Sequence, residues 1–168
     1  MAIEEPAYTL VKQEGLCSVR DYKSVLIIET VSDKASQNGQ FGTLAGYIFG
    51  GNNKKQKIAM TAPVLTSNQN NTSKMIFVMP KAMKLEDAPK PDDNAVLISK
   101  KFFGKVAVIA FKGRVSSKLV QKELAKLQVW LKTQSYQFQP EDYYVAQFNP
   151  PWILGPFRRN EIWVPVVD

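Results

Sequence analysis

Apolar and polar residues alternate with a period of two along most of this chain, and that pattern restricts it to a fold rich in half-buried β-strands. Helical spacing of apolar residues is found in two segments, 34–49 and 117–133. Runs of alternating or β-branched residues, bounded by glycine, proline or polar clusters, predict strands at 8–13, 17–22, 25–31, 57–66, 75–79, 96–102, 105–113, 143–148 and 161–166.

The predicted elements repeat. The order strand–helix–strand–strand occurs once in residues 25–79 and again in residues 105–166. This repeat predicts an α+β fold with pseudo-twofold symmetry, in which a distorted, near-closed antiparallel β-barrel is flanked by two α-helices. The segment 81–94, which is rich in proline and acidic residues, is expected to be a surface loop and not a linker. Residues 1–168 should therefore form a single domain with a core over about 6–166.

Composition limits the chemistry that is open to this chain. Hydrophobic residues make up 45% and charged residues 22%, as in ordinary soluble globular proteins. The net charge of +7 favours an anionic partner, such as nucleic acid, anionic lipid or a ligand with carboxylates. There is no histidine, which removes the usual general base near neutral pH and the commonest metal ligand. With Cys17 as the single cysteine, a zinc site is implausible.

Signals for a cellular compartment are few. A single cysteine allows no internal disulfide, which suits a reducing compartment. No run of about 18 apolar residues predicts a membrane span, and the acidic first residues do not resemble a signal or transit peptide. We therefore expect a protein of the cytoplasm, or of an organelle after loss of a targeting peptide. We also expect a monomer.

The first predicted helix carries an unusual set of glycines. Gly39, Gly42 and Gly46 lie on one flank of it, and each costs up to about 1 kcal/mol relative to alanine in a helix interior. Such a cluster indicates that something approaches the helix backbone closely. Either another strand or helix of the protein does so, which is the commoner case, or a flat ligand does.

A lysine-rich loop follows this helix. Gly50-Gly51 is expected to end the helix in a left-handed turn, and Lys54, Lys55 and Lys57 come next in the sequence. An apolar helix surface would then lie beside a cluster of positive charge. Flat, apolar ligands with two carboxylates, such as porphyrins, suit this combination.

Several motifs of this chain resemble the SOUL haem-binding protein family. They are AGYIFGGN at 45–52, KIAMTAPV at 57–64, and NPPW followed by RRNEIWVPV within 149–166. Their order and spacing agree with that family from about residue 6 to residue 166. The resemblance implies a small soluble binder of haem or related porphyrins, with a distorted β-barrel flanked by two helices. It places the ligand on the first helix and on the loop after the penultimate strand. The ligand-binding residues that it implies here are Asn38, Phe41, Leu44, Ala45, Gly46, Phe49, Lys54, Lys57, Trp152 and Arg158.

This chain departs from the family in its charges and its iron ligands. Some members carry basic side chains at the positions of Asn38 and Gly46, so the charge here must come from the lysine-rich loop or from Arg158 and Arg159. Without histidine, an iron ligand would have to be Met60, Cys17, Tyr47 or a lysine, or be absent. We therefore expect apolar contact and charge to hold the ring, and metal-free porphyrin to bind about as tightly as haem. About micromolar affinity would suit a carrier or buffer.

Other functions remain open. The apolar stretch 152–157 is either a lid over the ligand or a contact patch for a protein partner. An enzyme that acts on a bound tetrapyrrole, for example by removing its metal, could use Glu29 if that residue were buried. The commoner case is that such a residue points outward or pairs with a lysine. The residue pattern favours a binder over an enzyme. Nucleic-acid binding is disfavoured because Phe77 and Trp163, among other aromatics, occupy core-like positions.

Overall fold

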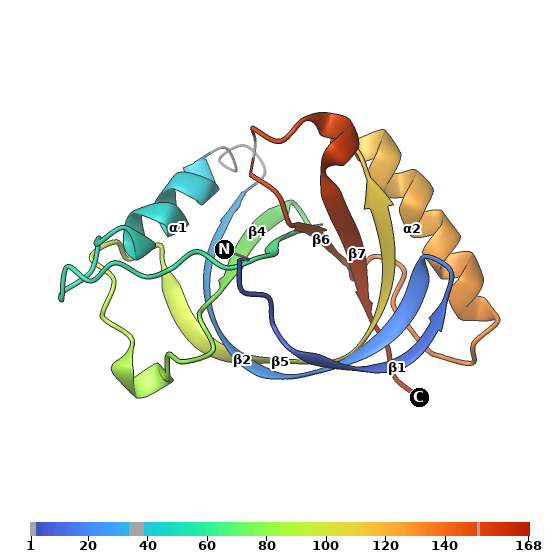
Figure 1. Ribbon diagram of the computed structural model, residues 1–168, viewed down its shortest axis with the longest axis horizontal. Helices are drawn as coiled ribbons and strands as arrows, with labels where there is room; N and C mark the ends of the chain where they lie inside the picture. The colour runs from blue at the N-terminus through green and yellow to red at the C-terminus, as the bar shows by residue number, and fades with distance from the viewer. Residues whose placement is uncertain (1–2, 34–38, 151) are drawn as a thin grey trace. The chain divides into compact units, whose positions relative to one another are not determined.

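The computed structural model describes residues 3–33, 39–150 and 152–168 (Figure 1). Its elements are, in order, β1 (Tyr8–Glu14), β2 (Cys17–Asp33), α1 (Gln40–Ile48), β3 (Val64–Gln69), β4 (Thr72–Val78), the 3-10 helix η2 (Leu85–Asp87), β5 (Leu97–Lys112), α2 (Ser117–Lys132), β6 (Tyr144–Gln147), the 3-10 helix η3 (Gly155–Phe157) and β7 (Arg159–Pro165). The predicted order is confirmed: β2-α1-β3-β4 is followed by β5-α2-β6-β7.

The chain divides into two compact units. The first unit comprises the residues up to Pro6 together with Ser24–Phe102, and the second comprises Ala7–Lys23 together with Phe103–Asp168. Two of the three boundaries fall inside long strands, so β2 and β5 each contribute residues to both units.

In the first unit, β4 lies between β2 and β3 in an antiparallel arrangement. Ile28 of β2 faces Phe77 of β4, and Val64 of β3 faces the same residue from the other side. Helix α1 packs on this sheet through Leu44, Tyr47 and Ile48, which are buried together with residues of β2 and β4. This burial explains why a helix of only 9 residues is stable, since isolated helices of such a length are marginal in water.

The second unit repeats the same pairing. Strand β7 lies between β5 and β6, again antiparallel, and β1 forms a hairpin with the first part of β2. Helix α2 buries the apolar stripe that its sequence predicts: Val120, Leu124, Leu127 and Leu131. Its N-cap is Ser116, whose hydroxyl accepts a hydrogen bond from the backbone N–H of Leu119 at 3.1 Å.

Two pairs of predicted strands are in fact single strands. The predicted strands 17–22 and 25–31 form one strand, β2, and 96–102 and 105–113 form another, β5. Gly104 lies inside β5 with a φ of +64°, so it bends the strand but does not end it. The sequence pattern predicts a break at this glycine because glycine is a common turn residue.

The predicted strand at 57–66 was placed too early. Strand β3 begins only at Val64, directly after Pro63, which has no N–H to donate to a ladder. The preceding residues hydrogen-bond elsewhere: Ile58 N–H donates to Ile48 O at 2.8 Å, and Ala62 N–H donates to Glu4 O at 2.9 Å. Lys57 therefore lies in a segment without regular structure.

A tight turn at Asn70 and Asn71 joins β3 to β4. Asn70 and Asn71 both adopt positive φ angles, 51° and 61°, as in a two-residue hairpin turn of type I′. This tight turn allows β3 to extend to Gln69 and β4 to begin at Thr72.

Candidate functional site

One side of α1 is open to solvent. Phe41 is 48% exposed and Phe49 68% exposed, and Gly42 and Gly46 are exposed between them. A Cβ atom added to Gly39, Gly42 or Gly46 would meet no described atom within 4 Å. The expectation that another element of the protein packs on these glycines is therefore wrong for the described part of the chain. We call Phe41, Gly42, Gly46 and Phe49 the glycine face.

The other side of α1 is buried and supports the glycine face. Leu44 is fully buried and Ala45 is 7% exposed, so both belong to the packed side of the helix more than to its open side. The Phe41 ring packs edge-on against the buried Phe77 ring, with centroids 5.4 Å apart. The predicted ligand residues of α1 therefore divide into those that present a surface and those that support it.

The two glycines after α1 build its C-terminal cap. Gly51 N–H donates to Gly46 O at 2.8 Å and Gly50 N–H to Tyr47 O at 3.3 Å, which is the paired pattern of a Schellman motif. Gly50 has a φ of +116°, and a Cβ on Gly51 would lie 2.7 Å from Gly46 O. Both positions thus require glycine for structural reasons, whatever ligand binds.

Asn52 shapes the lysine-rich loop. Its side chain is buried; the amide donates to Tyr47 O and Gln56 O, and its oxygen accepts from the N–H groups of Lys54 and Gln56. These four bonds hold the loop in a compact turn whose side chains Lys54, Lys55 and Lys57 are exposed. The main structural role of the motif AGYIFGGN is therefore to end α1 and to position the lysines.

The loop 84–93 is fastened to the same turn. Tyr47 donates its hydroxyl to Pro89 O at 2.6 Å, Lys90 N–H donates to Asn53 Oδ1 at 2.8 Å, and Asp92 N–H donates to Gly51 O at 3.1 Å. Lys54 Nζ donates to Asp87 O at 3.5 Å. This loop also carries the exposed carboxylates of Glu86, Asp87, Asp92 and Asp93. The positive potential of the lysines is consequently offset in part by acidic neighbours.

Two predicted ligand residues, Trp152 and Arg158, lie elsewhere. Trp152 is 79% exposed and Arg158 is half-buried, and both belong to the second unit. Arg158 donates through Nε to Ile153 O at 2.8 Å. Asn38 lies outside the described residues.

None of the three named candidates for an iron ligand lies on the glycine face. The Tyr47 hydroxyl is bonded to Pro89 O, and burial raises its pKa. Met60 is half-buried against the core of the first unit. Cys17 belongs to the second unit, where burial, and after it the charge of Glu123, raises the pKa of its thiol. A thiol with a raised pKa is a poor metal ligand near neutral pH.

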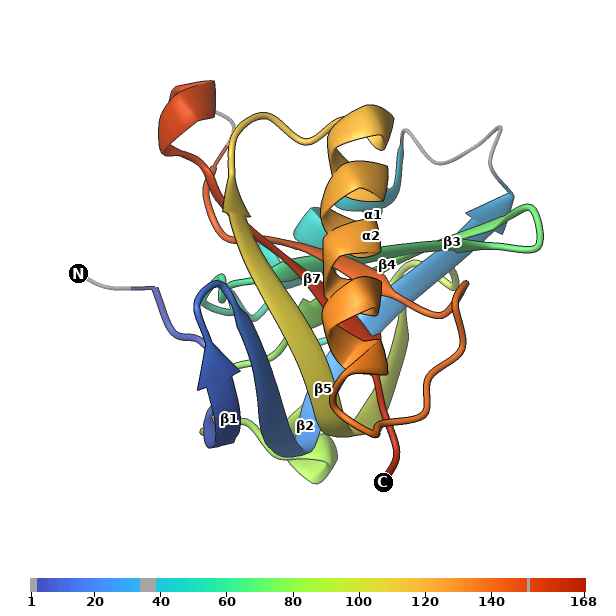
Figure 2. The same ribbon diagram turned by 90° about the vertical axis from the view of Figure 1, so that its right-hand side faces the viewer.

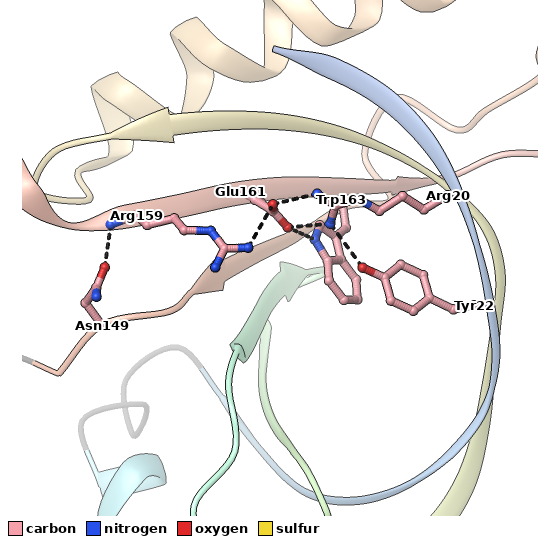
Figure 3. Close-up of polar contacts among 6 residues, drawn as sticks. All are labelled: Arg20, Tyr22, Asn149, Arg159, Glu161 and Trp163. Carbon is pink, nitrogen blue, oxygen red and sulfur yellow. Dashed lines mark hydrogen bonds and ion pairs between the residues drawn. The ribbon is translucent and has the colours of Figure 1, made fainter. Parts of the chain in front are cut away.

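A buried polar cluster in the second unit was not predicted (Figure 3). Arg20 donates two hydrogen bonds to Glu161, at 2.7 and 2.8 Å, and Trp163 Nε1 donates to Glu161 Oε1 at 2.9 Å. The Glu161 side chain is 2% exposed, and Arg20 also donates to the Tyr22 hydroxyl at 3.0 Å. Burial opposes the charge on Arg20, but the bonds to Glu161 outweigh it and raise the pKa of the guanidinium.

The sequence did contain a sign of this cluster. Glu161 stands in the apolar strand motif NEIWVPV, where a carboxylate must find a partner if it is buried. Its strand partners Ala110 and Ala146 are small and apolar, so the charge is satisfied by Arg20 and Trp163 instead. Arg20 Nε is buried without a hydrogen-bond partner among the described residues, and Glu161 Oε2 also lies 3.7 Å from Arg159 Nη2. We assign the cluster a structural role.

Glu29, the acid considered for an enzymatic role, forms an ion pair. Glu29 Oε2 lies 3.7 Å from Lys74 Nζ on the neighbouring strand, as the alternative of a lysine partner predicted. Among the described residues, no group of three or more cysteine and acidic side chains could hold a metal ion. No helix in the described part of the chain has the length and apolar character needed to cross a membrane.

Comparison with known proteins supports one family. The family described as "SOUL heme-binding protein" matches residues 3–165. The chain is similar to heme-binding protein 2 of Homo sapiens, with 30% identity covering 97% of this chain and 86% of the relative. It is also similar to heme-binding protein 2 of Mus musculus, with 29% identity covering 90% of this chain and 78% of the relative.

Solved structures show the same fold. An uncharacterized conserved protein from Listeria innocua has a TM-score of 0.69 at 10% identity, covering 90% of this chain and 92% of that one. The C-terminal domain of EcmrR has a TM-score of 0.63 at 11% identity, covering 96% and 98%. The predicted fold class is confirmed: α+β, a distorted antiparallel β-barrel with two helices. At such low identity these likenesses concern the fold alone.

Proposed function

Since this chain belongs to the SOUL heme-binding protein family, we propose that it binds haem or a related porphyrin on the glycine face of α1, as a carrier or buffer. The observation that carries the proposal is the open helix side at Gly42 and Gly46, bordered by the exposed rings of Phe41 and Phe49. The relatives named above are heme-binding proteins, and the family match covers nearly the whole chain.

A flat apolar ring fits this face for physical reasons. Without side chains at Gly42 and Gly46, a planar molecule can approach the helix backbone, while the two phenylalanine rings can pack against it. Burial of roughly 200 Å² of apolar ligand surface is worth about 5 kcal/mol, from which association entropy subtracts several kcal/mol. The exposed ammonium groups of Lys54 and Lys57 are suited to the propionates of the ligand, at about 1 kcal/mol or less each.

We propose that the ring, and not the iron, is recognised. Haem would supply an iron with open coordination positions, but this chain has no imidazole, and Tyr47, Met60 and Cys17 are committed to the protein interior or lie in the second unit. The contacts that remain are apolar packing and charge, which metal-free porphyrin makes equally well. We therefore expect dissociation constants for haem and protoporphyrin within about threefold of each other.

The test is a fluorescence and absorbance titration with both ligands. The double substitution Gly42→Leu and Gly46→Leu places two side chains on the glycine face, in space that no described atom occupies. Because a ring can then no longer reach the backbone, we expect at least about tenfold weaker binding of both ligands. The matched control is Ala125→Leu, at an exposed position of α2, which should bind as the unmodified chain does.

Two outcomes would contradict the proposal. Unchanged affinity in the double leucine variant, with the helix intact by circular dichroism, would exclude the glycine face as the site. A sharp spectrum of six-coordinate low-spin haem, together with failure of protoporphyrin to bind, would show that the iron is recognised and not the ring.

A further inference from the structure

We propose that the apolar loop, defined as Trp152–Phe157, docks on membrane surfaces that carry anionic lipid. Trp152 is 79% exposed, and Leu154 and Phe157 are each 69% exposed. Three large apolar side chains within six residues thus face water at one end of the second unit. Figure 2 shows the loop projecting at the same end of this unit as the connection from β5 to α2.

Hydrogen bonds within the loop and to Gly113 hold the apolar loop in place. Phe157 N–H donates to Leu154 O at 2.9 Å, and Arg158 donates through its backbone N–H to Gly155 O and through Nε to Ile153 O. Behind the loop, Gly113 N–H donates to Arg158 O at 3.1 Å. The apolar side chains are therefore presented by an ordered turn, and less conformational entropy is lost when they leave water.

Positive charge surrounds the apolar loop. Within 111–122 and 149–160, the segments that meet at this end of the unit, the sequence has no aspartate or glutamate. The cations there are Lys112, Arg114, Lys118, Lys122, Arg158 and Arg159. Arg114 is next to the loop, since a Cβ on Gly155 would lie 3.6 Å from Arg114 Cβ. Arg159 is engaged already, with its guanidinium over the Phe148 ring and 3.7 Å from Glu161.

This combination favours a lipid surface over a protein partner. Tryptophan, leucine and phenylalanine at a tip, with arginine and lysine around them, match the layered chemistry of a bilayer boundary, in which phosphates lie above acyl chains. Each cation near an anionic membrane adds to the attraction, and the whole chain is positive by 7 charges. The contact would be peripheral, by insertion of side chains at the lipid headgroups.

The experiment is vesicle sedimentation with the full chain, using phosphatidylcholine vesicles with and without phosphatidylserine. We expect binding to the mixed vesicles that weakens as salt rises, because the Debye length falls from about 10 Å at 0.1 M to about 3 Å at 1 M. The double variant Trp152→Ala and Leu154→Ser should bind about tenfold more weakly. Its matched control is Phe102→Ala, which removes an aromatic ring that is 70% exposed in the first unit.

Charge is tested separately. The double reversal Arg114→Glu and Lys118→Glu should lower binding at least about tenfold, since each cation near the surface contributes a factor of about five. The control is Lys23→Glu with Lys100→Glu, which changes the net charge equally at exposed positions outside the loop and outside 111–122. Emission of Trp152 should shift to shorter wavelength on mixed vesicles, because Trp163 is buried and Trp130 half-buried, and the shift should vanish without Trp152.

A variant that keeps Trp152 separates this inference from porphyrin binding. If the loop docks on lipid, Leu154→Ser with Phe157→Ala should bind the mixed vesicles about tenfold more weakly and keep its affinity for protoporphyrin in solution. The inference is overturned if the unmodified chain does not bind the mixed vesicles, or if the loop variant and the Phe102 control bind them equally. Loss of protoporphyrin affinity with unchanged vesicle binding would also overturn it, and would identify the loop as a lid over the ligand.

Discussion

Single glycines in and after α1 have opposite structural roles, although they are indistinguishable by residue type. Gly42 and Gly46 have open space where a Cβ would be, so they are not required by packing among the described residues. Gly51 is required, because its Cβ would approach Gly46 O at 2.7 Å. A glycine that destabilises a helix without a packing reason is a candidate for function, and this is why the glycine face is the proposed site.

This difference predicts opposite effects of alanine on stability. Gly42→Ala should raise the free energy of unfolding by up to about 1 kcal/mol, because alanine is the better helix former and its methyl group meets no described atom. Gly51→Ala should lower it by more than about 1 kcal/mol, because the Schellman turn must shift. Urea unfolding measures both. A loss of stability in Gly42→Ala would mean that the glycine face is packed and not open.

At the scale of elements, Arg20 and Glu161 join β2 to β7 within the second unit. The pair is held by two hydrogen bonds, and their side chains are 12% and 2% exposed. A buried pair of this kind gains little over apolar residues, but each partner is costly to leave alone. The pair therefore restricts how these two strands can be arranged more than it stabilises them.

Removal of one partner of this pair should therefore lower the stability of the protein strongly. Glu161→Gln leaves the Arg20 guanidinium buried without a counter-charge, and we expect a loss of about 3–5 kcal/mol in the free energy of unfolding. Replacing both residues, as Arg20→Met with Glu161→Leu, should cost much less. The control is Asp168→Asn, which removes an ion pair to Lys105 in which Asp168 is 73% exposed, and it should cost about 1 kcal/mol or less. If the single and double variants lose equal stability, an unpaired buried charge is not the cause of the loss.

At the scale of the whole molecule, each unit contains a buried tyrosine. Tyr47 in the first unit and Tyr22 in the second are both 2% exposed, and burial raises the pKa of each hydroxyl above its ordinary value. For Tyr22, the Arg20 guanidinium opposes this effect without reversing it. In the unfolded chain both hydroxyls would titrate near pH 10.

Stability should therefore fall in alkaline solution. A raised pKa in the folded state means that the contribution is complete below about pH 10 and is lost as pH rises toward the folded pKa, since the unfolded chain releases its protons first. Urea unfolding between pH 8 and 11 should show this decline. Tyr22→Phe and Tyr47→Phe should each make it shallower, whatever they do to stability at pH 8. An unchanged slope in both variants would show that these hydroxyls do not couple to folding.

Local patterns determined much of this protein. The spacing of apolar residues identified both helices and the repeated order of elements, because those signals come from which side of an element is buried. The glycines and lysines around α1 also marked the candidate site, since residue type alone sets their cost and charge. Strand boundaries at Gly104 and Lys57 were misjudged, because glycine and proline have the same local preferences inside a strand and in a turn.

Tertiary structure decided what each of these residues does. Only the fold shows that no described segment covers Gly42 and Gly46 while Leu44 is buried, because openness depends on where the other segments lie. The pairing of Arg20 with Glu161, 141 residues apart in the sequence, likewise depends on how β2 and β7 come together. The preference of a residue for helix, strand or turn follows from the sequence around it. Its contacts depend on segments that are distant in the sequence. Only those contacts show whether a residue has a structural or a functional role.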